Sequence, residues 1–406
     1  MFIYGLSTLI GLITVYLWKR LVRDTTRPGR ARRVLGAGLF TLTALLAATL
    51  IVPRVTGRLA APWFAWPGYL WLGLLAYLFM ALLALEPVRF VLRGWVKRTP
   101  AEPVVTTATE PTTTKLLTEE APAATAVERR VFLARASAVV AGAVSVSVVG
   151  FGAARALGPP DVLQVPVGLR RLAPAFNGFR IAVVSDIHLG SLLGRAHTER
   201  IVRMINEAGP DMVAIVGDLV DGSVGELGAA VAPLRDLTSS EGTFFVTGNH
   251  EYHRDDTFAW LRELEGHGIQ LLRNANTEIW RGASSFGLAG VNDVSGDEKS
   301  EPPDFDRALS GLDASRPTIL LAHQPVQVEE AAARGVDLQL SGHTHGGQMW
   351  PFQYAVAAAH PSLAGLSTVN DTQLYVTRGA GFWGPPVRVG APPDITVLTL
   401  HGTGDT

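Results

Sequence analysis

Acidic, amide and imidazole side chains recur in five short clusters in the second half of the sequence, beside glycines or after apolar runs. Side chains of these types bind divalent cations such as those of Mn, Zn or Fe. A set of this size can hold two metal ions, and two-metal sites are typical of hydrolases. The clusters therefore predict a reaction class before any fold is considered. They are Asp186-Ile187-His188, Gly217-Asp218, Gly248-Asn249-His250-Glu251, the single His323 and Gly342-His343-Thr344-His345.

The spacing within the clusters indicates how the ligands could be shared. Asp186 and His188 flank one apolar residue, so in an extended segment both side chains face the same way and can bind one ion. His343 and His345 have the same spacing, which allows one to serve each metal. Asp218 follows an apolar run and a glycine that lets the backbone turn closely, and we expect its carboxylate to bridge two cations about 3.5–4 Å apart.

The remaining residues complete the predicted chemistry. Asn249 offers an amide oxygen and His323 an imidazole to the second ion. A metal pair lowers the pKa of a bound water toward neutrality, so that a metal-bridged hydroxide can attack phosphorus in line. His250 stands beside a ligand without being needed as one, and we expect it to be the catalytic residue that protonates the leaving oxygen. The predicted function is hydrolysis of phosphomonoesters or phosphodiesters with two divalent metal ions.

This motif set resembles that of the calcineurin-like metallophosphoesterase superfamily, in which D-x-H, G-D, G-N-H-[ED], H and G-H-x-H follow one another. The resemblance covers roughly residues 175–400. It implies a four-layer α/β/β/α sandwich, and it implies that His250 contacts the phosphate and assists departure of the leaving group. One implied metal site takes Asp186, His188, Asp218 and His345, and the other takes Asp218, Asn249, His323 and His343.

Three shorter segments resemble the bacterial membrane-tethered branch of this superfamily: residues 176–180 (FNGFR), 346–348 (GGQ) and 378–384 (RGAGFWG). Arg378 either holds a phosphate or caps a turn, and it joins Asn249 and His250 as an expected substrate-binding residue. Purple acid phosphatases carry a tyrosine ligand three residues after the bridging aspartate, where this chain has Asp221. That departure favours a plain pair of Mn, Zn or Fe ions over a tyrosinate-iron site.

The composition excludes several other kinds of site. The sequence has no cysteine, so any metal must use oxygen and imidazole ligands, and disulfides are excluded. Residues 1–159 carry 18 Lys and Arg against 7 Asp and Glu, whereas the rest of the chain carries 17 against 29. The basic residues lie between apolar stretches without aromatic interleaving, which is typical of membrane-protein loops and not of a nucleic-acid surface. We expect no nucleic-acid partner.

Apolar runs in the first half of the sequence have the length of transmembrane helices, for which about 20 residues cross about 30 Å. Residues 2–18, 34–52 and 69–85 predict a three-helix transmembrane region over residues 1–98. A weaker run, 137–154, is either a fourth transmembrane helix or a buried soluble helix. Because Lys and Arg follow the first and third runs, we expect those loops in the cytoplasm and everything after residue 155 outside. The prediction is a multipass cell-membrane protein with an extracytoplasmic catalytic domain.

The segment between the third and fourth runs is rich in Thr, Pro, Ala and Glu, which predicts a disordered linker over residues 99–128. Residues 128–133 (ERRVFL) resemble an internal twin-arginine export signal, which would make the export machinery a partner. A basic flank beside a membrane helix explains the same residues. Residues 129–157 hold this segment and the fourth helix. Cleavage near residues 154–156 would release the domain, but the preceding spans favour retention.

From residue 160 to residue 402, short apolar runs alternate with amphipathic segments, which predicts an α/β domain. Buried strands are expected at residues 179–185, 212–216, 243–246, 318–322 and 338–340, and helices at 196–208 and 258–265. The ligand clusters fall at the carboxyl ends of these strands, where open α/β sheets place their sites. His197 and His253 stand outside the motifs and are expected at the surface or at helix ends, with His253 a partial exception because it lies three residues after His250 in the expected site loop.

Two alternatives to a general phosphoesterase stay open. One is a lipid-linked pyrophosphatase acting on UDP-diacylglucosamine, which would require a cytoplasmic domain. The other is a non-catalytic membrane-tethered sensor, against which the complete ligand set and His250 stand. The apolar segment 349–366, after the last pair of histidines, is either core or a lid over the site, or a membrane-facing surface that admits a lipid phosphoester.

Overall fold

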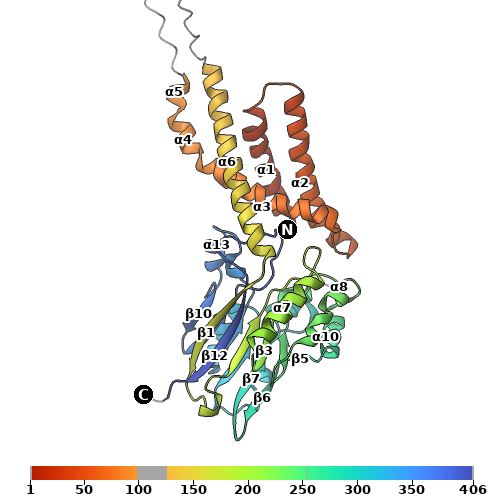
Figure 1. Cartoon of the computed structure of the whole chain (residues 1–406), viewed down its shortest axis with the longest axis vertical. Coiled ribbons are helices and arrows are strands. Elements are labelled where there is room, and N and C mark those ends of the chain that lie inside the picture. Colours follow the sequence, from red (N-terminus) through yellow and green to blue (C-terminus); the bar gives the residue numbers. More distant parts are fainter. Residues whose placement is uncertain (1, 98–125, 254, 405–406) are drawn as a thin grey trace, which may run out of the picture. The chain divides into compact units, whose positions relative to one another are not determined.

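The computed structural model describes residues 2–97, 126–253 and 255–404, which Figure 1 draws as helices and strands. The chain forms two compact units. The first comprises Met1–Ala47 with Trp71–Val149, and the second comprises Ala48–Leu70 with Gly150–Thr406. The second unit therefore contains the ligand clusters together with the segment that joins two long N-terminal helices.

The N-terminal part of the chain is helical, as the apolar runs predict. Its helices are α1 (Phe2–Leu17), α2 (Arg30–Thr56), α3 (Pro62–Ala84), α4 (Glu86–Val91), α5 (Arg93–Lys97) and α6 (Ala126–Leu157). Among the described residues, three helical segments are long and apolar enough to cross a membrane: Arg30–Thr56, Pro62–Val91 and Val127–Leu157. The run 2–18 forms α1, which has 16 residues and continues into a π-helical segment, Trp18–Arg23.

Helix α6 contains both the segment that resembles a twin-arginine signal and the fourth apolar run. The predicted linker 99–128 lies outside the described residues up to position 125, and residues 126–128 begin this helix. The residues that resemble a twin-arginine signal form its first turns, and the weaker apolar run 137–154 continues them. The result is one unbroken helix of 32 residues.

Two six-stranded sheets form the framework of the second unit (Figure 1). The strands are β1 (Asp161–Leu169), β2 (Arg180–Val184), β3 (Met212–Val216), β4 (Thr243–Val246), β5 (Gln270–Leu271), β6 (Ala275–Arg281), β7 (Ser284–Gly290), β8 (Thr318–Leu321), β9 (Leu338–Ser341), β10 (Gly365–Val369), β11 (Thr372–Val376) and β12 (Asp394–Gly402). The first sheet has the order β1-β12-β2-β3-β4-β5, in which β2 to β5 are parallel. The second has the order β10-β11-β9-β8-β7-β6, in which β7, β8, β9 and β11 are parallel.

Buried apolar side chains from the two sheets form a shared core. Within it, Phe176, Phe179 and Phe286 pack edge to face, with ring centroids 5.0–5.6 Å apart. This geometry adds an electrostatic attraction between rings to the free energy gained by burying their area. Helices α7 (Arg195–Ala208), α8 (Val224–Val231) and α10 (Thr257–Gly266) pack on the first sheet, and α11 (Phe305–Leu309) and α12 (Val328–Ala333) pack on the second. The predicted four-layer α/β/β/α sandwich is confirmed.

The strands and helices expected after residue 160 are present, with ends that coincide or differ by one residue. The burial of some individual side chains differs from what the sequence predicts. His197 lies in the first turn of α7, at a helix end as expected, but it is buried, with 6% of its surface exposed, because the helix turns this face toward the sheet. The core interpretation of segment 349–366 is wrong, since Trp350, Phe352 and Tyr354 are exposed around the short helix α13 (Gln353–Ala357).

Candidate metal centre

The seven expected ligands follow five strands, and both sheets contribute. The carboxyl ends of parallel strands meet at one edge of a sheet, which brings side chains that are distant in sequence together. The structure places all seven in this one region. From the first sheet come Asp186 and His188 after β2, Asp218 after β3 and Asn249 after β4, and from the second come His323 after β8 and His343 and His345 after β9.

One group of donor atoms consists of Asp186, His188 and His345. The Nε2 atoms of the two imidazoles lie 3.0 Å apart. The Asp186 carboxylate oxygen Oδ1 lies 3.3 Å from Nε2 of His345 and 3.9 Å from Nε2 of His188. All three donor atoms therefore converge on a space in which one cation could be bound.

A second group consists of Asp218, His323 and His343, and Asn249 lies next to it. Nε2 of His323 is 3.3 Å from Asp218 Oδ2 and 3.2 Å from Nδ1 of His343. The same His343 nitrogen lies 2.8 Å from the side-chain oxygen of Asn249. This group offers one carboxylate, one amide and two imidazole donors.

Asp218 lies between the two groups. Its Oδ2 atom, 3.3 Å from Nε2 of His323, is also 3.8 Å from Nε2 of His188. Asp218 is 2% exposed, and its backbone N–H and carboxylate are held by neighbouring loops. A single carboxylate thus faces both groups, which is the position of a bridging ligand.

An unpartnered oxygen of Asp186 and the neutral forms of His343 and His345 fit cation binding. Asp186 Oδ1 is buried and has no hydrogen-bond partner among the described residues, which is costly unless a cation satisfies it. Burial lowers the pKa of His345 well below its usual range, and Arg388 adds to this effect. Burial, with the charge of His323, lowers the pKa of His343 to about 3. Both imidazoles are therefore neutral at pH 7, which is the form that binds metals.

Backbone conformation is strained at most of these positions. Left-handed backbone is uncommon for residues other than glycine, and each such residue costs about 1–3 kcal/mol. Strain of this kind persists only where surrounding structure enforces it, and it concentrates at functional sites. Five of the seven expected ligands have φ between 48° and 70°: Asp186, His188, Asp218, His343 and His345.

Two motif glycines are required by close approach of neighbouring atoms. A Cβ atom at Gly248 would overlap the Asp218 carboxylate, and a Cβ at Gly342 would overlap the side chains of Ser185 and Asp186. These glycines therefore allow the loops after β4 and β9 to approach the ligands that follow β2 and β3.

Glu251 fixes the loops that carry the bridging ligand. Its buried carboxylate accepts hydrogen bonds from the backbone N–H groups of Asp218 at 3.0 Å, Leu219 at 2.8 Å and Gly248 at 2.7 Å. Burial, together with the charge of Asp218, raises its pKa to about 7 in spite of these bonds. Glu251 closes the G-N-H-[ED] motif, but its role cannot be read from the motif, because the bonds depend on how two separate loops approach each other.

Asp221 joins two histidines of the site. Its Oδ1 atom lies 2.5 Å from Nδ1 of His250 and 3.2 Å from Nδ1 of His188. Burial raises the pKa of Asp221, but the two histidines outweigh burial and bring it well below its usual range. Burial lowers the pKa of His250, and the charges of Asp218 and Asp221 outweigh burial and raise it to about 9. The interaction orients His250 and holds it in its protonated form.

Two arginines lie behind the ligand loops. Arg378 Nε donates to Asp394 at 2.7 Å, and this side chain is not among those that line the cavity beside His250. Its expected phosphate contact therefore stays a prediction. Arg388 is 1% exposed and donates to the backbone carbonyls of His345 at 2.7 Å and Gly381 at 3.1 Å. Arg388 therefore holds the backbone of the loop that carries His343 and His345. No local motif indicates this role.

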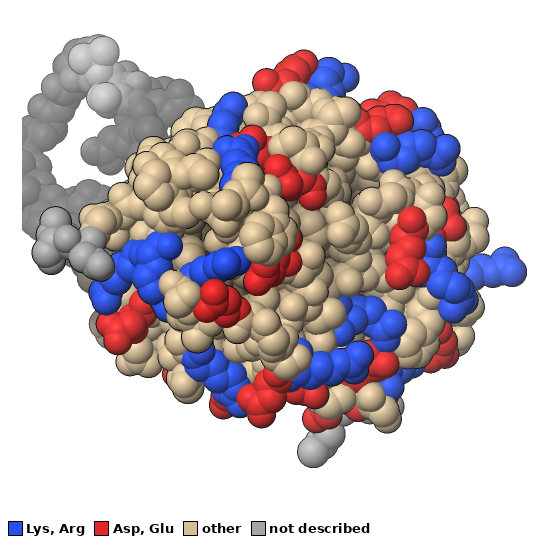
Figure 2. All heavy atoms as spheres, turned by 90° about the horizontal axis from the view of Figure 1, so that it is seen from below, with Lys and Arg blue, Asp and Glu red and all other residues tan. Residues whose placement is uncertain are grey.

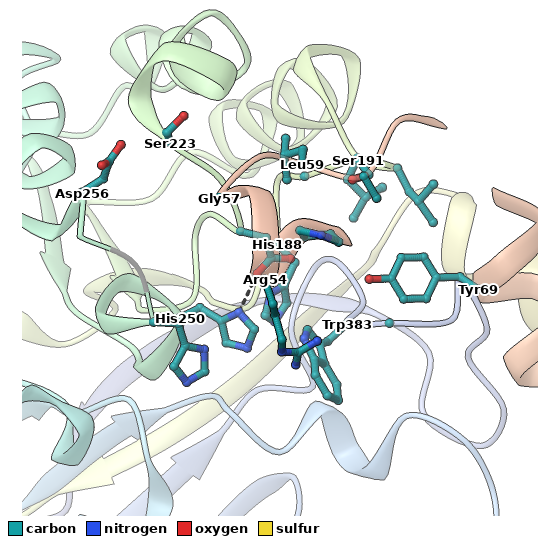
Figure 3. Close-up of a pocket in the computed structure, with 18 of the residues that line it drawn as sticks. Arg54, Gly57, Leu59, Tyr69, His188, Ser191, Ser223, His250, Asp256 and Trp383 are labelled. Carbon is teal, nitrogen blue, oxygen red and sulfur yellow. Dashed lines mark hydrogen bonds and ion pairs between the residues drawn. The ribbon is translucent and has the colours of Figure 1, made fainter. Parts of the chain in front are cut away.

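A cavity of about 680 Å³ opens beside the first ligand group, and Figure 3 shows part of its lining. His188, His250 and Asp221 line it, together with His253 and Trp383. A substrate can therefore reach His250 through this cavity.

Comparison with known proteins identifies the family. A model described as calcineurin-like phosphoesterase matches residues 179–347. Two vertebrate relatives, each named transmembrane protein with metallophosphoesterase domain, are 38% identical over 259 residues in Danio rerio and 40% identical over 289 residues in Bos taurus. These matches cover 62% and 67% of this chain but only 59% and 64% of the relatives.

A shorter bacterial relative is matched over most of its length. The Bacillus subtilis protein named uncharacterized metallophosphoesterase YkuE is 31% identical over 263 residues, which is 63% of this chain and 91% of that protein. The residues that the family model matches contain all five ligand clusters. On these grounds the chain belongs to the calcineurin-like metallophosphoesterase family.

Proposed function

We propose that this protein is a binuclear metal-dependent phosphoesterase that hydrolyses phosphomonoesters or phosphodiesters. The observation that carries the proposal is the position of Asp218, whose Oδ2 atom faces His188 in one donor group and His323 in the other. A carboxylate in that position can bridge two cations. Family membership supports the reaction class, because metallophosphoesterases cleave phosphoric esters.

The donor groups assign the ligands. One divalent ion would be held by Asp186, His188, Asp218 and His345, and the other by Asp218, Asn249, His323 and His343. When bound, such a pair lowers the pKa of a shared water and neutralises charge on the phosphoryl oxygens. Oxygen and imidazole donors suit Mn, Zn or Fe.

His250 acts as the general acid in this proposal. It lines the cavity, and its Nδ1–H is bound to Asp221, so its Nε2–H is the group that can donate to the leaving oxygen. The raised pKa keeps that proton in place at neutral pH. Asp221 then stabilises the imidazolium before the proton transfer and fixes the orientation of the ring.

We also propose that the protein crosses the cell membrane several times and carries its catalytic unit on the extracytoplasmic side. The Lys and Arg distribution supports this orientation. The backbone N–H of Leu59, between α2 and α3, donates to Glu226 of the catalytic unit at 2.8 Å, so both must lie on one side. Helices α3 and α6 stand between these two points in the chain, and two crossings would return it to the same side.

A catalytic unit at the outer membrane surface is compatible with a lipid-linked substrate and with export by the twin-arginine machinery. Exposed Trp350, Phe352 and Tyr354 are the kinds of side chain that reside at a membrane interface, which supports a lipid-linked phosphoester as substrate. The residues that resemble a twin-arginine signal support delivery by the twin-arginine machinery.

The test uses the purified full-length protein in detergent, stripped with a chelator and reloaded separately with Mn, Zn or Fe. Aryl phosphomonoesters, aryl phosphodiesters and lipid-linked phosphoesters are assayed alongside metal content. We expect hydrolysis that requires metal, and about two ions per chain. Asp218→Asn should lose metal and activity, whereas Asp371→Asn, a change in an exposed turn, should keep both. Absence of hydrolysis with every metal, and unchanged metal content in Asp218→Asn, would overturn the proposal.

A further inference from the structure

Part of the wall of the cavity beside His250 comes from the segment that joins α2 to α3. Residues Pro53, Arg54, Gly57, Leu59 and Ala60 line the cavity, as does Tyr69 near the start of α3. These residues belong to the same compact unit as the ligand clusters. A substrate at His250 therefore meets residues that precede the metallophosphoesterase domain by roughly 90 to 110 positions.

The joining segment is anchored to that domain. The backbone N–H of Leu59 donates to Glu226 Oε1 at 2.8 Å. The Leu59 side chain packs closely on Gly222, where an added Cβ would lie 3.1 Å from it. Next to the joining segment, Thr49 Oγ1 in α2 donates to the carbonyl of Phe64 in α3 at 3.1 Å, which links the two helices. The wall is thus a fixed part of the cavity.

Arg54 adds a fixed positive charge to this cavity, beside that of protonated His250. It is the one Arg or Lys among the described lining residues, whereas the domain contributes Asp221, Asp255, Asp256 and Glu298. Figure 3 shows the Arg54 side chain directed into the cavity, in the direction of Trp383. One guanidinium nitrogen donates to the carbonyl of Leu50 at 2.6 Å. A guanidinium has five N–H donors, so it retains the capacity to bind a phosphoryl group.

We propose that Arg54 is a substrate-positioning residue that binds an anionic oxygen of the phosphoester held beside His250. The inference rests on the proposed function and adds to it, because the cation that orients the substrate comes from the membrane-helix region. Leu59, Tyr69 and Trp383 border the same space, so the substrate that fits has an anionic phosphoester group and an apolar body.

The test compares Arg54→Gln, Arg54→Lys and Arg58→Gln in the full-length, metal-loaded protein. Arg58 is the matched control, since it lies in the same segment, is exposed and does not line the cavity. Steady-state kinetics with an aryl phosphomonoester and an aryl phosphodiester give kcat and KM. Calorimetry with inorganic phosphate gives a dissociation constant that does not depend on turnover.

For Arg54→Gln we expect KM and the phosphate dissociation constant to rise about tenfold or more, with a smaller change in kcat, because a charge-assisted hydrogen bond is lost. Arg54→Lys should restore part of the loss, and Arg58→Gln should match the wild type. A larger effect on the monoester would place Arg54 on the oxygen that carries the second ester group in the diester. An equal effect on both substrates would place it on a non-bridging oxygen that monoester and diester share.

The outcomes separate the two proposals. If the wild type hydrolyses substrate and Arg54→Gln behaves as the wild type does, Arg54 has no positioning role and the proposed function stands. If the wild type binds phosphate more tightly than Arg54→Gln but hydrolyses nothing, the proposed function fails and the anion site stands. If the wild type neither binds phosphate nor hydrolyses any substrate, both proposals fail.

Discussion

Oδ1 of Asp221 lies 2.5 Å from Nδ1 of His250, and the same oxygen lies 3.2 Å from Nδ1 of His188. One carboxylate oxygen thus orients both a proposed ligand and the proposed general acid. Because the charges of Asp218 and Asp221 together keep His250 protonated, and Asp221 also orients its ring, Asp221 and His250 should act as a unit in catalysis.

Asp221→Asn should lower kcat by about 10²-fold, the lower end of what general acid catalysis contributes, while metal content changes little. His250 is active when protonated, so activity falls as pH rises through its pKa. Removing the carboxylate lowers that pKa, and the alkaline limb of the pH–rate profile should move to lower pH. Asp255→Asn is the control, since Asp255 lines the same cavity but pairs with Lys299. An unshifted alkaline limb in Asp221→Asn would argue against His250 as the acid.

Gly248→Ala should remove metal and activity together. The added Cβ would overlap the Asp218 carboxylate, so the bridging side chain must move. Metal content by mass spectrometry and hydrolysis of an aryl phosphoester measure the two effects. Gly266→Ala is the control, because a Cβ at that position at the end of α10 meets no atom within 4 Å. Full metal occupancy in Gly248→Ala would contradict this account of the glycine.

Glu251→Gln should destabilise the fold. The carboxylate accepts three backbone hydrogen bonds, and an amide has a single acceptor oxygen, so at least one buried N–H loses its partner at a cost of about 1–3 kcal/mol. Chemical unfolding of the metal-free protein measures this loss without a contribution from ligand binding. Glu329→Gln, an exposed change on α12, should leave the free energy of unfolding unchanged. Equal stability of the two variants would refute the role of Glu251.

His197 should make the fold sensitive to acid. Burial, with the charge of Arg200, lowers its pKa to about 4, whereas an unfolded chain has a histidine pKa of about 6.5. Between these values the unfolded state binds more protons, so stability is complete above about pH 6.5 and falls by up to about 1.4 kcal/mol per pH unit as pH drops toward 4.

Thermal unfolding in chelator from pH 7 to pH 5 tests this, since no metal is then lost during titration. His197→Gln should show a shallower decline in the unfolding temperature than the wild type. His401→Gln, an exposed change near the end of β12, should decline as the wild type does. Parallel curves for all three proteins would mean that His197 does not titrate on unfolding.

The sequence predicts the central strands well because they are buried on both faces. Each appears as an uninterrupted apolar run, and the ligand clusters follow the runs directly. The pairing of β12 with β2 and β1 could not be predicted, because it joins segments more than two hundred residues apart. Periodicity carries no information about such contacts.

In the candidate site, too, some residues can be predicted from the sequence and others cannot. Side chains that could bind a metal are recognisable by type and spacing, whereas those that orient them are not. Asp221, Glu251 and Arg388 act through contacts between separate loops, and their neighbours in sequence do not indicate their partners. The proposed role of Arg54 is harder still to predict from the sequence. Arg54 occupies the last turn of an apolar helix, where a basic residue ordinarily marks a membrane boundary.

In the proposed centre, each ion takes ligands from both sheets: the first from β2, β3 and β9, and the second from β3, β4, β8 and β9. The bound ions would therefore hold the two sheets together along their seam, the line where the packed sheets meet at the ligand loops. Linkage is reciprocal, so whatever loosens the seam must also weaken metal affinity. A cavity made by Phe286→Ala, among the aromatic rings of the shared core, should then appear as a defect in metal retention although it touches no ligand.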